Sequence, residues 1–130
     1  MQLKAQLSHF YHPVHDIKEG IKFFKDILGL KVNFSNLTTT TQEEISSDDV
    51  SNLQWVEFDA GHVILLVQNV PSIVPYDTGI GFTVDNIDEA FIYFKNNDID
   101  ISRPIEGIQG KIRTFEIKDP TGSTFTIFGN

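Results

Sequence analysis

The chain has 130 residues, no cysteine, and 18 acidic against 10 basic side chains, which gives a net charge of -8. This length fits one domain of roughly 100 to 200 residues. The negative charge repels phosphate backbones and anionic membranes, so we expect no nucleic-acid partner. The lack of cysteine excludes disulfides and thiolate chemistry. No apolar run approaches the roughly 18 residues that span a membrane, and we expect no targeting signal, no membrane contact and a cytoplasmic location.

Residues 8–16, SHFYHPVHD, hold three of the four histidines at equal spacing. Proline inside a helix costs about 3 kcal/mol, so the segment is predicted to be a short strand. Alternation then places His9 and His15 on one face, about 20 Å apart over six steps of roughly 3.3 Å, and His12 on the opposite face. No two of them can bind one ion from a straight strand. We expect His12 to face a helix layer and His15, like His62 at a later turn, to lie at the surface.

The next segment is repeated later in the chain. A displacement of 70 residues aligns residues 14–26, VHDIKEGIKFFKD, with residues 84–96, VDNIDEAFIYFKN. Apolar side chains recur at i, i+3, i+4 and i+7 in both copies, which predicts two amphipathic helices. Asp16 and Asn86 are suited to cap their N-termini, and Gly29 is suited to end the first helix.

Several strands are predicted around these helices, at residues 31–34, 53–58, 61–66, 99–102, 111–118 and 122–127. A displacement of 61 aligns GHVILL (61–66) with GSTFTI (122–127), each after a turn. Each half is therefore expected to run strand, helix, strand, strand, strand. The halves, 8–70 and 76–130, would form one α+β domain over residues 1–130, in which two tandem βαβββ units build a curved sheet with the helices on its outer face.

Two segments between these elements are polar or proline-rich. Residues 35–52, SNLTTTTQEEISSDDVSN, are expected to form a solvated loop or, alternatively, a flap over a pocket. Residues 69–78, NVPSIVPYDT, contain two prolines that favour an extended linker.

These features together resemble the glyoxalase, bleomycin-resistance and extradiol-dioxygenase superfamily, also called the vicinal oxygen chelate superfamily. The resemblance covers residues 9–128. It rests on the order and spacing of His-x6-Asp (9–16), FF (23–24), LGL (28–30), VDNIDEA (84–90) and DPTG (119–122). It implies a cup-shaped cavity lined by the strands, and a homodimer.

Enzymes of this superfamily hold a divalent metal with His, Glu or Gln from the first and last strand of each unit. The resemblance places His9, Leu65, Gly79 and Thr126 at these four positions. Only His9 is a usual ligand for such an ion, whereas a catalytic metal usually has about three protein ligands. We therefore predict no metal cofactor.

Strand alternation predicts the rest of the cup lining. The residues expected there are Tyr11, Val63, Val67, Gly81, Thr83, Thr124 and Phe128. This lining is apolar and aromatic with a few hydroxyls, and it suits an organic ligand. Further polar contributors are Trp55, Glu57, Arg113 and Glu116, whose direction the sequence leaves open. Arg113 is expected to pair with an anionic ligand or equally with an acidic neighbour.

Three hypotheses for function follow. The first is a metal-free protein that binds a small organic molecule, similar to the bleomycin-resistance branch; the acidic charge favours a cationic or amphipathic ligand. Its predicted ligand-binding residues are His9, Tyr11, Trp55, Leu65, Gly79, Arg113, Glu116 and Thr126. The alternative is a divalent-metal-dependent lyase, isomerase or dioxygenase that uses His9 with Glu57 or Glu116 and His62. The third is a dimeric scaffold that serves another protein. Catalysis and catalytic residues are left open.

Overall fold

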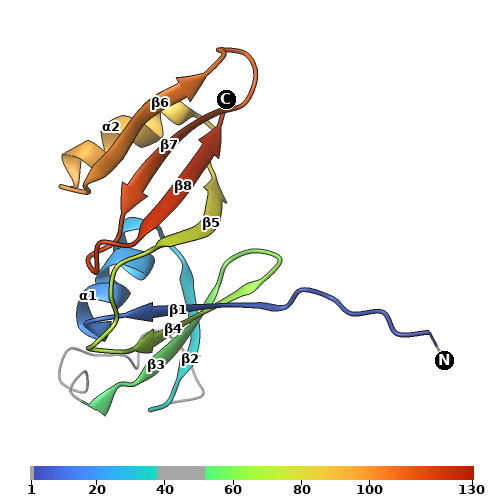
Figure 1. The fold of residues 1–130 in the computed structure, drawn as a ribbon, viewed down its shortest axis with the longest axis vertical. Helices are drawn as coiled ribbons and strands as arrows, with labels where there is room; N and C mark the ends of the chain where they lie inside the picture. Colours follow the sequence, from blue (N-terminus) through green and yellow to red (C-terminus); the bar gives the residue numbers. More distant parts are fainter. Residues whose placement is uncertain (1, 38–51) are drawn as a thin grey trace. The chain divides into compact units, whose positions relative to one another are not determined.

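The computed structural model describes residues 2–37 and 52–130. The chain divides into two compact units, Met1–Ile73 and Val74–Asn130. Each unit has a four-stranded sheet and its own helical segment (Figure 1). The predicted α+β fold with two tandem βαβββ units is confirmed.

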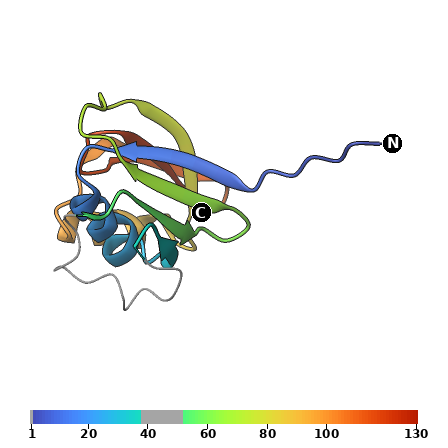
Figure 2. The ribbon, with the colours of Figure 1, turned by 90° about the horizontal axis from the view of Figure 1, so that it is seen from below.

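The first unit has the sheet order β1-β4-β3-β2, in which β1 is parallel to β4 and the other neighbours are antiparallel. Its elements are β1 (His9–Val14), α1 (Ile17–Ile21), η1 (Lys22–Ile27), β2 (Lys31–Ser35), β3 (Trp55–Asp59) and β4 (Ile64–Asn69). Figure 2 shows the helical segment on one side of this sheet.

The first helical segment was predicted to be α-helical, but it is so only over α1, Ile17–Ile21. Asp16 caps α1 as expected, because its Oδ1 accepts a hydrogen bond from the Lys18 amide at 3.0 Å. From Lys22 onward, however, the helix is of the π type, and the Leu28 amide donates to the carbonyl of Phe23 at 2.9 Å. Apolar spacing alone does not distinguish such a turn from an α-helix. Gly29, with φ of 72°, follows the helix as predicted.

His12 lies in the core of the first unit, as predicted. Its side chain is fully buried and its ring meets Phe24 edge-on, with 5.7 Å between the ring centroids. Phe24 in turn packs on Phe58 of β3, at 5.9 Å. The face of the sheet that carries His12 and Phe58 is therefore the one covered by the helical segment. Burial of each such aromatic side chain contributes about 1.5–3 kcal/mol.

The second unit repeats this arrangement with the order β5-β8-β7-β6. Its elements are β5 (Asp77–Thr83), α2 (Ile87–Asn96), β6 (Ile101–Gly107), β7 (Arg113–Lys118) and β8 (Thr124–Gly129). Asn86 caps α2, since its Oδ1 accepts from the Glu89 amide at 3.0 Å. Phe91 and Phe94 of α2 pack on Phe115 of β7 at 5.3 and 5.9 Å.

Two further predictions concern the remaining parts of the chain. The polar segment 35–52, expected as a loop or flap, falls mostly on residues 38–51, which lie outside the described residues. Among the helices of the described residues, none is long and apolar enough to cross a membrane.

Candidate functional site

Each sheet has one face covered by the helices of its own unit, and we call the opposite one its open face. Residues that pair across neighbouring strands share a face. On the first open face one row of pairs crosses all four strands, and it consists of Tyr11, Leu66, Glu57 and Phe34. The corresponding row in the second unit consists of Gly81, Thr126, Glu116 and Arg103. Glu57 and Glu116 therefore occupy equivalent positions.

His9 and Glu57 are brought together on the first open face. The distance from His9 Nε2 to Glu57 Oε1 is 3.8 Å, with side-chain exposures of 48% and 14%. Ser8 Oγ lies 2.8 Å from His9 Nδ1, which fixes the direction of the ring. The two residues lie within ion-pair distance but form no hydrogen bond with each other, because the separation exceeds normal hydrogen-bond lengths.

Aromatic side chains surround this pair. Trp55 shares the open face with Glu57, two residues away on β3. Its ring meets Phe34 edge-on, with centroids 5.7 Å apart. Tyr11, from β1, is half exposed on the same face. The predicted contributors His9, Tyr11 and Trp55 thus share one surface, and the structure settles the direction of Trp55 and Glu57 that the sequence left open.

The predicted direction of Leu65 is wrong. Leu65 is 2% exposed and lies on the helix-covered face, as does Val67 at 0%. Gly61 precedes the first residue of β4, Ile64, by three positions, whereas Gly122 precedes the first residue of β8 by two. Counting from the turn glycines therefore misses the register by one residue in the first unit. The residue equivalent to Thr126 is Leu66, and it faces the open side.

Glu116 and Thr126 lie opposite each other on the second open face, which fixes the direction of Glu116 that the sequence left open. The carboxylate of Glu116 has partners within the second unit. Ser102 Oγ donates a hydrogen bond to Glu116 Oε1 at 2.7 Å, and Arg103 Nε lies 3.9 Å from the same oxygen. The side chain of Glu116 is 18% exposed, close to the value for Glu57.

Arg113 takes the second of its two predicted partners, an acidic neighbour. Arg113 comes three residues before Glu116 on β7, so its side chain points to the opposite face, which is the helix-covered one. There its Nη2 and Nη1 donate to Asp88 Oδ2 and Oδ1 at 2.7 and 3.2 Å. This hydrogen bonding lowers the pKa of Asp88 below its ordinary value of 3.8. Arg113 is therefore not placed with the other predicted ligand-binding residues.

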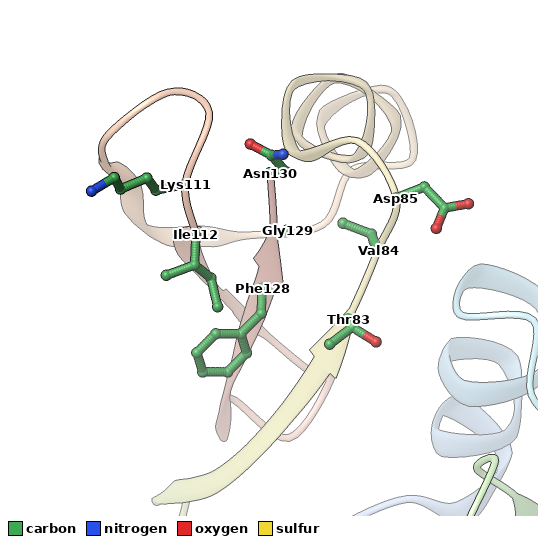
Figure 3. A pocket seen from close by; sticks show the side chains of 8 residues that line it. All are labelled: Thr83, Val84, Asp85, Lys111, Ile112, Phe128, Gly129 and Asn130. Carbon is green, nitrogen blue, oxygen red and sulfur yellow. The ribbon is translucent and has the colours of Figure 1, made fainter.

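A pocket of about 400 Å³ opens at the end of β5 and β8, and sequence reasoning did not identify it as a site. It is lined by Thr83, Val84, Asp85, Lys111, Ile112, Phe128, Gly129 and Asn130 (Figure 3). Phe128 and Ile112 approach each other in the pocket, while Lys111 and Asp85 point outward on opposite sides. Thr83 and Phe128 pair across β5 and β8, which confirms that they share a face. The sequence signal for this pocket was that Thr83 and Phe128 were both expected to line the cup.

The sequence model of the glyoxalase/bleomycin resistance protein/dioxygenase superfamily matches residues 6–127. The chain belongs to this superfamily. No curated protein sequence matches it. A superfamily member from Sphaerobacter thermophilus is 19% identical, with a TM-score of 0.72 and 98% of each chain covered. At such identity the likeness shows the fold alone.

Two other solved structures share this fold. The fosfomycin resistance protein FosX from Listeria monocytogenes is 17% identical with a TM-score of 0.72, over 98% of this chain and 95% of that one. A lactoylglutathione lyase from Agrobacterium tumefaciens is 16% identical with a TM-score of 0.69, over 98% of this chain and 96% of that one.

Of the four positions that the resemblance assigns to the superfamily's metal, only one has a usual metal ligand in this chain. With the register corrected, they fall on His9, Leu66, Gly79 and Thr126. Gly79 also lies in a bulge of β5, between the pairs of Asp77 and Gly81, and has φ of 70°. A histidine would be strained in that conformation. Residues 2–37 and 52–130 contain no group of three His, Cys, Asp or Glu side chains suited to an ion. Among the described residues, the donor set therefore does not fit the metal of the superfamily.

Proposed function

We propose that this protein binds a small organic molecule without a metal ion, and that the first open face contributes the binding surface. The observation that carries the proposal is that three of the four positions which the resemblance assigns to the superfamily's metal ligands are Leu66, Gly79 and Thr126, while the first open face keeps aromatic and polar side chains. Leucine cannot ligate, Gly79 has no side chain, and a threonine hydroxyl is a weak ligand. His9, the one usual ligand that remains, lies beside the carboxylate of Glu57 and shares its face with aromatic side chains.

The chemistry of the first open face supports this proposal. Tyr11, Trp55 and Phe34 offer flat apolar surface with two polar ends, and such rings bind planar organic groups. His9 and Glu57 supply a donor and an acceptor that can fix the orientation of a ligand. A mostly apolar surface with few polar groups is typical of small-molecule sites.

A thermal-shift screen tests the proposal. The purified protein is heated with divalent metals, thiols, aromatic acids, neutral aromatics and organic cations in parallel. A ligand at 100 times its Kd stabilises the folded state by about 2.7 kcal/mol, which is a readily measured shift in Tm. We expect an organic compound to raise Tm and no divalent metal to do so. Stoichiometric metal in the purified protein that is lost on chelation and rebound afterwards would contradict the proposal, and so would a screen without any organic ligand.

We also propose that the protein is a homodimer. The support is its membership of the superfamily, in which paired units are common, and light scattering coupled to size exclusion measures the mass directly. A monomer at all concentrations would contradict this proposal. A cytoplasmic location stays a prediction of the sequence.

A further inference from the structure

The equivalent carboxylates of the two units differ in what neutralises them. Glu116 receives a hydrogen bond from Ser102 and has Arg103 as its neighbour on β6. At the matching place on β2 the first unit has Phe34, because Phe34 pairs with Glu57 as Arg103 pairs with Glu116. The second unit thus provides its own cation for this carboxylate, and the first unit has an aromatic ring in its place.

Glu57 nevertheless has nearly the same environment as Glu116 in terms of burial. Its side chain is 14% exposed, against 18% for Glu116. Within the part of the chain that the structure describes, the carboxylate of Glu57 accepts no hydrogen bond, and its one ion-pair neighbour is His9 at 3.8 Å. A carboxylate removed from water is stabilised by a cation or a donor close to it. The described residues of the first unit therefore leave Glu57 with capacity for a further partner.

We propose that the first open face binds an organic cation, whose charged group lies beside the Glu57 carboxylate as the guanidinium of Arg103 lies beside that of Glu116. This inference rests on the proposed function and names its ligand class. The rings of Phe34 and Trp55, edge-on at 5.7 Å, share this face with Glu57, since Phe34 pairs with Glu57 and Trp55 is two residues away on β3. Aromatic faces attract ammonium and guanidinium groups, and they also stack on planar cations. The net charge of -8 attracts such a ligand from solution.

The tryptophan content of the chain provides a local probe. Trp55 is the single tryptophan, so its fluorescence reports on this surface alone. Three aromatic cations serve as probes: 1-methylquinolinium, phenyltrimethylammonium and benzamidinium. Quinoline, which is uncharged at pH 7.5, is the matched neutral compound for the first. Titration calorimetry measures affinity, and a saturable change in Trp55 fluorescence locates the binding.

Three variants separate charge from shape. Glu57→Gln keeps the size of the side chain and removes its charge, and we expect at least a tenfold loss of affinity for the cations. Glu106→Gln, at an exposed carboxylate on β6 of the second unit, is the control for the loss of one negative charge, with an expected change of less than twofold. Phe34→Arg recreates the internal pair of the second unit, and we expect it to abolish binding of the cations. Thermal melts of all three confirm that they fold.

The outcomes are decisive in both directions. Saturable binding of a cation that depends on Glu57 and exceeds that of the neutral compound supports the inference. Equal binding of quinoline and 1-methylquinolinium, an unchanged Glu57→Gln variant, or no binding of any of the three cations overturns it. If the cations fail while a neutral or anionic compound raises Tm in the screen, the proposed function stands without this ligand class. If no compound of any charge binds, both fail.

Discussion

Asp88 at the start of α2 and Arg113 at the start of β7 form a two-point ion pair that connects helix and sheet in the second unit. The two N–O distances are 2.7 and 3.2 Å. Asp88 is also in the first turn of its helix, where a negative charge is favourable. The pair therefore connects α2 to β7 through two hydrogen bonds between opposite charges.

The first prediction concerns the pH dependence of this pair. The hydrogen bond from Arg113 lowers the pKa of Asp88 below 3.8, so the stabilisation is fully present above that pH and is lost as the pH falls through the lowered value. We expect Asp88→Asn to reduce Tm modestly at pH 7, and the difference from the wild type to vanish at the acid end. Melting curves from pH 2 to 7 measure it. The exposed Asp85→Asn is the control, and a pH-independent loss in Asp88→Asn would rule out the ion pair as its cause.

The second prediction tests the corrected register of β4. Leu65→Ala should reduce the free energy of unfolding by about 2–5 kcal/mol, because it leaves a cavity in a packed core. Leu66→Ala, on the open face, should have a smaller effect on stability and should weaken ligand binding. The matched control is Leu7→Ala. Because Leu7 is 67% exposed, this substitution should change stability by no more than about 0.5 kcal/mol. Urea unfolding gives all three values, and a larger loss for Leu66 than for Leu65 would mean that the register is wrong.

The sequence predicted the fold well because the repeat and the alternation act over many residues. The apolar spacing of both helices and the capping by Asp16 and Asn86 are local patterns with direct structural consequences. The π-helical turn from Lys22 is different, since it changes the hydrogen bonding without changing which residues are apolar. Periodicity could not reveal it.

The candidate site was less predictable because it depends on register. One additional residue between Gly61 and β4 moved Leu65 to the core and Leu66 to the open face. The directions of Trp55 and Glu57 follow only once β3 is paired with β4. The contrast between Phe34 and Arg103 needs the pairing of two further strands that both contain a bulge. Such relationships are set by tertiary structure, to which a single sequence gives little access.

The third prediction concerns Gly79, the superfamily metal position on β5. Its φ of 70° lies in the left-handed region, which a histidine occupies at a cost of about 1–2 kcal/mol. We expect Gly79→His to lose about that much stability in urea unfolding. Gly79→Asn is the control, because asparagine tolerates this conformation better and should lose less. Equal stability of the wild type and Gly79→His would show that the bulge is not a barrier to a ligand at this position.

The last prediction concerns how the Phe128 ring is held beside the pocket of the second unit. A Cβ added to Gly81 would clash with Cε2 and Cδ2 of Phe128, so the ring lies directly against the glycine backbone. Gly81→Ala should therefore destabilise the protein by about 1–3 kcal/mol, as overpacking does. Phe128→Ala removes the clashing ring, and in that background the added methyl group should cost much less. A double-mutant cycle by urea unfolding should give a coupling of about 0.5–3 kcal/mol, whereas additive effects would mean that Gly81 is needed for the strand and not for the ring.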